Sequence, residues 1–455
     1  MSLAKTIIYG SLKELEIRLQ QESNLNVIDE YGFTPLIQTA IINDFDKGEL
    51  LLEHGADVNF RDISGASALH WTVENNNIPF SQLLLNYQAD PNAYTLAADP
   101  VLVKPIMRKQ RICRDMLVNA GASMDFANDY INTKLLGHRF ELSGYVDIVD
   151  PKGRFVEVDL EGFILEFTIG IVHQSLEEYR NHFAARHLRE SFIFLDKIVE
   201  AFNTATKLIK YQQYQTDFLA NGKIIDDLLD AETLIIPIAY QGHAISLVKR
   251  GHILAKCDRS ENDLFIDNVV LYQMTKPHFL TKDLLKQLMY HRQTKNFIDL
   301  ELNHLLGLKA ITKLQIGSQI SGNCSWANIE SCVPVIFYLH TNTFNKDHTR
   351  EALSFYYQWL EWDKDRALQF CMKEIDKISV VRRISKATLL AAVLFQRCSA
   401  ELQTDIERAL NIIKLLKTPE LEYLLKSYIE IYCNRNPSPA GSNLQKLLRL
   451  AEGYI

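Results

Sequence analysis

A fixed period in the amino-terminal quarter of the chain constrains the fold more than any other feature of the sequence. Four anchor residues stand at steps of 33 residues: Asn26, Asn59, Asn92 and Asp125. Leu36, Leu69 and Leu102 keep the same step. A repeat of this length is the signature of a solenoid, in which each unit buries its apolar face only against its neighbours. We therefore expect the chain to begin with one continuous stack of helical units.

The segments between these anchors resemble the ankyrin repeat, whose unit is also about 33 residues long. The matching stretches are FTPLIQTA (33–40), LLLEHGADVNFRD (50–62), SALHWTV (67–73), LLLNYQADPN (83–92) and MLVNAGASMDF (116–126). Pro35 fits the first turn of a helix, where its missing N–H costs nothing, and Gly55 and Gly121 fit left-handed C-caps. The resemblance predicts four ankyrin repeats over residues 1–130, with residues 1–26 as a divergent cap.

Ankyrin repeats imply a protein partner, so the turns of the stack are candidate contact sites. The candidates are Asn59, Asp62, Trp71, Asn92 and Tyr94. The two asparagines also resemble substrates of eukaryotic asparaginyl hydroxylase, but the simpler interpretation is that they hydrogen-bond the turn. Between the third and fourth units, YTLAADPVLVKP (94–105) replaces the usual turn sequence, so we expect a longer or displaced finger there.

Composition limits the functions that the chain can have. Its 455 residues, 47% of them hydrophobic, can form more than one core. A net charge of −7 without a basic block gives no electrostatic footprint for nucleic acid or a membrane surface. Seven cysteines without a CxxC pair argue against a disulfide framework or a zinc site and indicate a reducing compartment. We expect a monomer with no cofactor, no metal, no Sec-type signal and no membrane span.

Near residue 144 the pattern changes from helical spacing to alternation. YVDIVD and RFVEVDLEG predict a hairpin around residues 151–153, and a long helical stretch follows at 174–202. Strand patterns come next: TLIIPIAY (233–240), HAISLV (243–248), HILAKC (252–257) and DLFIDNVVLYQM (263–274). We expect a multidomain α plus α/β protein, with a mixed α/β domain at 140–345 and an all-helical module at 346–455.

Two residues of the central strands are candidates for acid–base chemistry. If Arg250 and Gly251 form a two-residue turn, His243 pairs with Asp258 across the hairpin. A register shift of two residues leaves both side chains on one face, because strand side chains alternate. A carboxylate in that place can orient an imidazole as a general base. Three nearby residues are rivals for these roles: His252 as the base, and Glu261 and Asp263 as the acid.

The candidate nucleophile lies in QISGNCSWANIESCVPVIFYLH (319–340). Asn323 can cap a helix and place Cys324 in its first turn, where the helix dipole and a nearby imidazolium favour the thiolate. Gln319 can aim its amide at the oxyanion that forms when a thiolate attacks a carbonyl, and Ser321 with Gly322 can form the tight turn between them. Apolar residues follow at helical spacing: Trp326, Ile329, Val333 and Phe337.

The chain order of His243, Asp258, Gln319 and Cys324 resembles that of the ubiquitin-like-protein proteases and the YopJ-type acetyltransferases. Papain-family proteases have a similar Gln-turn-Cys segment but the opposite order. Together with the ankyrin repeats, the order resembles that of the ankyrin effectors that Legionella injects into host cells. This resemblance implies a cysteine-protease-like central domain, type IV secretion, and action in a host cytosol or nucleus. The sequence departs from the pattern because Gln319 lies closer to the cysteine, Asn323 replaces an acidic residue, and Ser325 replaces a glycine.

Two classes of function remain open at this point. In the first, the repeats bind a host protein while the candidate triad hydrolyses a peptide or isopeptide bond or transfers an acyl group. In the second, the chain is a non-catalytic adaptor whose protease fold is degenerate, because a fold does not determine a function. An aromatic run in the tail is either core or a partner-binding stripe, and helical spacing favours core: Phe355, Tyr356, Tyr357, Trp359 and Trp362.

Overall fold

The computed structural model describes residues 3–22, 24–212, 218–240, 242–260, 269–320, 322–341, 345–373, 375–435 and 438–453. The chain forms two compact units, the first made of residues 1–135, 144–160 and 375–455 and the second of 136–143 and 161–374. Neither unit is continuous in sequence, so their limits differ from the expected limits at 1–130, 140–345 and 346–455. The hairpin near residue 150 packs in the first unit, and the helix that follows residue 345 packs in the second.

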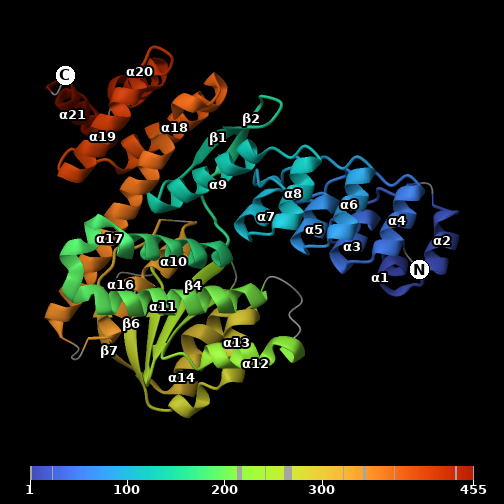
Figure 1. Cartoon of the computed structure of the whole chain (residues 1–455), viewed down its shortest axis with the longest axis horizontal. Helices are drawn as coiled ribbons and strands as arrows, with labels where there is room; N and C mark the ends of the chain where they lie inside the picture. The colour runs from blue at the N-terminus through green and yellow to red at the C-terminus, as the bar shows by residue number, and fades with distance from the viewer. Residues whose placement is uncertain are drawn as a thin grey trace. The chain divides into compact units, whose positions relative to one another are not determined.

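The first unit opens with stacked helix pairs, which follow one another along the chain in Figure 1. The helices are α1 (Leu3–Tyr9), α2 (Leu12–Leu19), α3 (Pro35–Ile42), α4 (Phe45–Glu53), α5 (Ala68–Glu74), α6 (Ile78–Asn86), α7 (Val103–Met107), α8 (Arg111–Asn119) and α9 (Met124–Arg139). Pro35 begins α3 after a Thr34 N-cap, as the sequence predicts. The leucines that share the 33-residue period are buried between the pairs, which explains why they recur.

The backbone repeats with the same period as the sequence. Gly32, Gly65 and Ala98 have positive φ angles of 85°, 81° and 60° in successive fingers. The N–H of Thr95 donates to the carbonyl of Asp99 at 3.1 Å, which is the hydrogen bond that closes the two preceding fingers. The expectation of a longer or displaced third finger is therefore wrong. Ala98 adopts the left-handed conformation that glycine provides elsewhere, so the finger keeps its length without the usual sequence.

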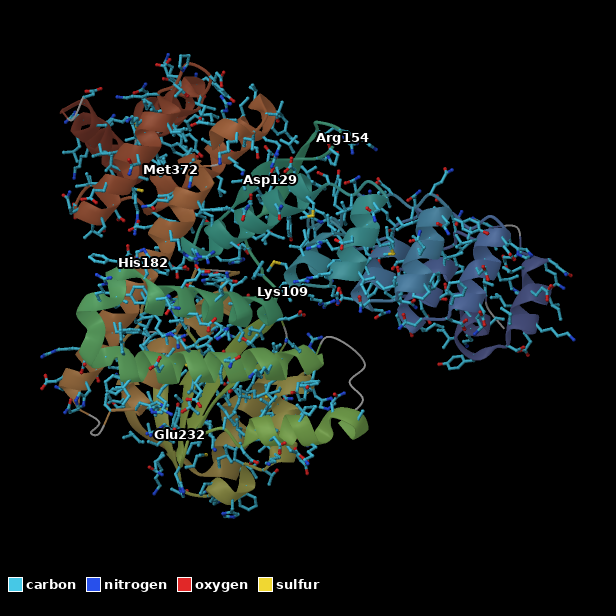
Figure 2. The ribbon with its side chains drawn as sticks, in the orientation of Figure 1. Lys109, Asp129, Arg154, His182, Glu232 and Met372 are labelled. Carbon is cyan, nitrogen blue, oxygen red and sulfur yellow. The ribbon has the colours of Figure 1, made fainter. Side chains whose placement is uncertain are left out.

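The hairpin and the carboxyl-terminal helices complete the first unit. Strands β1 (Tyr145–Val149) and β2 (Phe155–Asp159) pair antiparallel, as the alternating pattern predicts. The helices that follow are η5 (Ile375–Lys377), α18 (Val380–Arg397), α19 (Gln403–Leu416), α20 (Glu422–Ile429), η6 (Glu430–Arg435) and α21 (Pro439–Gly453). Arg382 of α18 donates to Asp125 and to Asp129 of α9, each at 2.6 Å (Asp129 is labelled in Figure 2). These ion pairs join the tail helices to the end of the repeat stack.

The second unit contains a five-stranded antiparallel sheet in the order β3-β4-β5-β6-β7. Its strands are β3 (Thr233–Tyr240), β4 (His243–Arg250), β5 (Ile253–Cys257), β6 (Val269–Met274) and β7 (Leu308–Leu314). The first four match the predicted strand patterns. Strand β7 was not predicted, because most of its side chains are exposed or half-buried and its sequence LKAITKL carries two lysines.

Helices cover both faces of this sheet (Figure 1). One layer contains α10 (Leu165–Asn181), α11 (Phe192–Ile209), α15 (Cys324–Glu330), α16 (Cys332–Leu339) and α17 (Lys346–Lys373), preceded by η1 (Phe183–Ser191) before α11. The other contains η2 (Lys210–Gln212), α12 (Phe218–Leu229), η3 (Pro277–Phe279), α13 (Lys282–Tyr290), η4 (Phe297–Glu301) and α14 (Leu302–Leu306). Ile235 faces the first layer while Ile236 faces the second, as strand alternation requires. This three-layer packing fixes one end of β4 beside α15.

Helices account for every described element after residue 345, as the sequence predicts for this region. In the aromatic run, Phe355, Tyr356 and Trp359 are at most 2% exposed, so these three are core. Tyr357 is 45% exposed and does not belong to the core. Among the described residues, no helix is both long enough and apolar enough to cross a membrane.

Candidate functional site

His243 and Asp258 lie together at one end of the sheet. His243 is the first residue of β4, and Asp258 directly follows β5. The register pairs Arg250 with Ile253, so it is shifted by two residues from the predicted pairing. The predicted consequence of such a shift is confirmed, because the two side chains share a face and Nε2 of His243 lies 2.9 Å from Oδ1 of Asp258.

The rivals for these two roles have different positions. His252 is an exposed residue of the turn that joins β4 to β5, at the far end of β4 from His243. It therefore cannot replace His243 beside the same acid. Glu261 and Asp263 lie outside the described residues. Asp258 has further partners, since Ser260 donates from its hydroxyl at 2.8 Å.

Cys324 is the first residue of helix α15, in the first turn as predicted. The residue before it behaves differently from the prediction, because the Asn323 side chain makes no capping hydrogen bond. Its Oδ1 instead lies 2.6 Å from Nδ1 of His138, and Asn323 is 2% exposed. The predicted single helix is broken at Ser331 into α15 and α16. Its four predicted apolar residues are buried: Trp326, Ile329, Val333 and Phe337.

The three side chains form a chain of hydrogen bonds. Hydrogen bonds with Asp258 and Cys324 outweigh burial and raise the pKa of His243 to about 9. Burial acts to raise the pKa of Asp258, but the hydrogen bonds from His243 and Ser260 lower it to about 2. Because Nε2 of His243 is bound to Asp258, Nδ1 is the ring nitrogen that remains available to the thiol. The acid is therefore ionised and the imidazole is protonated at neutral pH.

The same contacts favour the thiolate of Cys324. Burial alone would raise the pKa of this half-buried thiol, but the hydrogen bond with His243 lowers it below the usual value. Hydrogen bonds from the backbone to the sulfur at Ala244 and Ser325 act in the same direction. Burial raises the pKa of Cys113 to about 11 instead. A partly exposed cysteine with a lowered pKa beside an imidazolium is chemically suited to nucleophilic attack.

Gln319 and Gly322 lie in the segment that leads to Cys324. The N–H of Gln319 donates to the carbonyl of Arg259 at 2.9 Å, which places this segment beside the residue that follows Asp258. Among the described residues, Oε1 of Gln319 is buried without a hydrogen-bond partner. Gly322 has a φ of 74° and packs against Glu161 so closely that a Cβ would clash. The turn therefore requires glycine, whereas its other expected residue, Ser321, lies outside the described residues.

The ankyrin candidates are largely engaged inside the repeat stack. Oδ1 of Asn59 accepts from the N–H of Asp90 at 2.7 Å, and its Nδ2 donates to a carbonyl. Asn92 makes the equivalent pair of hydrogen bonds one repeat later. These contacts agree with the interpretation that the asparagines hydrogen-bond the turns. The indole of Trp71 donates to Asp62 at 2.9 Å.

Tyr94, the last of these candidates, packs edge-on against Phe126 at a centroid distance of 5.7 Å. Arg61 lies over its ring, with the guanidinium carbon 5.4 Å from the ring centroid. The ring is half-buried and therefore retains some surface at the fingers. Contact of the five ankyrin candidates with a partner remains a prediction.

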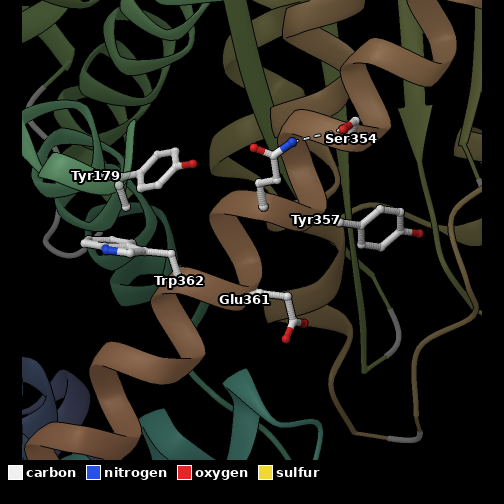
Figure 3. Close-up of a pocket in the computed structure, with 7 residues that line it drawn as sticks. Tyr179, Ser354, Tyr357, Glu361 and Trp362 are labelled. Carbon is white, nitrogen blue, oxygen red and sulfur yellow. Dashed lines mark hydrogen bonds between the residues drawn. The ribbon is translucent and has the colours of Figure 1, made fainter. Parts of the chain in front are cut away.

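A separate cleft of about 590 Å³ opens beside helix α17 in the second unit. Figure 3 shows Tyr179, Tyr357 and Trp362 around it, and Nε2 of Gln358 donates to the hydroxyl of Ser354 at 3.0 Å. The two aromatic residues of the tail run that are not fully buried thus line a cleft. None of the residues that line it belongs to the candidate triad.

Comparison with known proteins gives a match over nearly the whole chain. The family model for ankyrin repeats, with three copies, matches residues 3–95. No curated protein matches the chain. A solved structure, "Structure of Legionella Effector AnkH", is 41% identical in sequence, with a TM-score of 0.83. The match covers 99% of this chain and 97% of the AnkH chain.

Proposed function

This chain belongs to the family of the Legionella effector AnkH, and we propose that it binds a host protein through its ankyrin repeats and attacks an acyl carbonyl with Cys324. The observation that carries the catalytic part is the hydrogen-bonded series from Asp258 through His243 to Cys324. We further propose secretion through a type IV system, with action in the host cytosol or nucleus. A reducing host compartment suits a free thiolate.

The proposed reaction begins with attack of the Cys324 thiolate on a carbonyl carbon. The carbonyl π electrons move to oxygen, and Nε2 of Gln319 donates a hydrogen bond to this oxyanion. As the tetrahedral intermediate collapses, the C–N bond of an amide donor or the C–S bond of a thioester donor breaks, and the His243 imidazolium gives its proton to the leaving amine or thiolate. The product of this half-reaction is a thioester on Cys324.

The second half-reaction determines the class of enzyme. If neutral His243 takes a proton from water, hydroxide attack on the thioester releases a carboxylic acid and restores the thiolate, which is hydrolysis of a peptide or isopeptide bond. If an amine or hydroxyl of a bound protein attacks instead, the acyl group is transferred. Both outcomes use the same three side chains, so the nature of the acceptor decides between them.

The alternative is a non-catalytic adaptor that uses the same fold for binding alone. The observation that favours it is Asn323, which stands where the enzyme families that the sequence resembles have an acidic residue and is turned into the fold against His138. The two proposals differ in one measurable property. An enzyme forms an acyl or covalent adduct on Cys324, whereas an adaptor does not.

The test is trapping of the nucleophile. We would incubate the full chain with ubiquitin and ubiquitin-like proteins that carry a carboxyl-terminal vinyl sulfone, and separately with acetyl-coenzyme A. Intact and peptide mass spectrometry would then locate any adduct. An adduct on Cys324 that is lost in His243→Ala supports the enzyme. Absence of adducts with every probe, for a chain that still binds a host protein, supports the adaptor.

A further inference from the structure

One buried side chain joins the segments that carry the candidate base, acid and nucleophile. Asn328 lies on α15, about one helical turn after Cys324, and is 1% exposed. Its Nδ2 donates to the carbonyl of Ala244 at 2.7 Å, and its Oδ1 accepts from the N–H of Arg259 at 2.7 Å. Ala244 directly follows the candidate base, and Arg259 directly follows the candidate acid. Both ends of one amide therefore hold the backbone next to two catalytic side chains.

The backbone groups that Asn328 holds have further contacts with the site. Arg259 accepts at its carbonyl from the N–H of Gln319 at 2.9 Å, and its Nε donates to the carbonyl of Gly317 at 2.7 Å. Backbone hydrogen bonding at Ala244 also lowers the pKa of Cys324. Displacement of either backbone group would therefore move the oxyanion donor or the thiol environment as well as the base and the acid.

We propose that Asn328 is the positioning residue of this site: it sets the separation of Cys324, His243 and Asp258 without touching substrate. This inference rests on the proposed function of Cys324. An amide suits the position because one end must donate to a carbonyl and the other must accept from an N–H. An aspartate has the same size but cannot donate to Ala244, and an alanine fills neither role. Either change leaves a buried backbone group without its partner.

The chain contains a matched control for this asparagine. In the first unit, Nδ2 of Asn443 donates to the carbonyl of Cys398 at 2.7 Å, and its Oδ1 accepts from the N–H of Ala400 at 2.8 Å. Asn443→Ala thus removes the same pair of backbone hydrogen bonds from a helix that carries no candidate catalytic residue. Its effect reports the structural cost of losing the same pair of backbone hydrogen bonds at a half-buried position.

The experiment measures alkylation of Cys324 by iodoacetamide from pH 4 to 9 in wild type, Asn328→Ala, Asn328→Asp and Asn443→Ala. Peptide mass spectrometry assigns the modified cysteine. Cys257 and Cys332 are 0% exposed, so their protection reports that each variant remains folded. Asn328→Asp keeps the size and the acceptor, which provides a second variant if the alanine unfolds the unit. A purely structural residue would not move the pH midpoint of Cys324 labelling in a folded protein.

We expect both Asn328 variants to label Cys324 roughly tenfold or more slowly at pH 6, because each pKa unit of increase lowers the thiolate population tenfold. Asn443→Ala should match wild type. A folded Asn328 variant whose midpoint equals that of selectively labelled wild type would overturn the positioning role and leave the catalytic proposal intact. If wild-type Cys324 itself shows no preferential labelling below pH 7, both proposals fail.

Discussion

Replacement of Asp258 by asparagine should weaken the ion pair between His243 and Cys324. The His243 pKa of about 9 lies well above its ordinary value of 6.5. This difference corresponds to on the order of 3 kcal/mol, at about 1.4 kcal/mol for each pKa unit. The hydrogen bond with Asp258 is the largest cause of the increase, ahead of the hydrogen bond with Cys324, and the Asp258 charge acts in the same direction. Asp258→Asn should therefore lower the His243 pKa by about one unit or more.

The assay has two readouts. NMR of imidazole-labelled protein would follow the protonation midpoint of His243, and iodoacetamide labelling at pH 6 would follow the thiolate of Cys324. We expect the midpoint to fall and the labelling rate to decrease about tenfold, because each unit by which the His243 pKa falls shifts the shared proton about tenfold from the imidazolium–thiolate pair towards the neutral imidazole and thiol. Asp150→Asn is the control, since Asp150 is also buried but orders the β1–β2 turn. A midpoint that stays near 9 in Asp258→Asn, or a labelling rate within about twofold of wild type, would show that Asp258 does not sustain the ion pair.

Three further predictions concern stability and binding. Asp363→Asn should destabilise the second unit by about 3–5 kcal/mol, because Asp363 pairs with buried Arg139 at 2.5 Å; urea unfolding checks this, and a loss below about 1 kcal/mol would contradict it. Burial raises the Glu330 pKa from 4.5 to about 8, so folding takes up a proton between these values and stability falls as pH rises through that window. Glu330→Gln should reduce the fall in melting temperature with rising pH. An unchanged dependence of melting temperature on pH would show that Glu330 ionises freely. Asn92→Ala should lower the free energy of unfolding by roughly 1–2 kcal/mol, because it removes two inter-repeat hydrogen bonds. Calorimetry of the melting transition measures this loss, and a smaller loss would contradict the prediction.

The repeat stack could be predicted in detail because its physical causes are local and periodic. Each unit buries the same leucine against the next, so the period is visible in the sequence. The hairpin at residues 145–159 could also be predicted from the sequence, because its buried and exposed residues alternate. The conformation of the third finger could not be predicted, because Ala98 takes a left-handed conformation that is usual only for glycine.

The candidate triad could be assembled from the sequence because strand parity survives an error in register. His243 and Asp258 stay on one face after a two-residue shift, so the predicted contact holds although the predicted pairing does not. Asn328 was missed, since its partners lie 84 and 69 residues away and only the fold brings them together. Its spacing of four from Cys324 was the one available signal, because it places both residues on one helix face.

The pH dependence of alkylation tests directly whether Cys324 is a thiolate held by His243. Wild type and His243→Ala would be treated with iodoacetamide from pH 4 to 9, with each cysteine quantified by peptide mass spectrometry. Wild-type Cys324 should react below its ordinary pKa of about 8.5 and faster than half-buried Cys433, and His243→Ala should remove this advantage. Equal reactivity of Cys324 and Cys433, unaffected by His243→Ala, would show that His243 does not hold Cys324 as a thiolate.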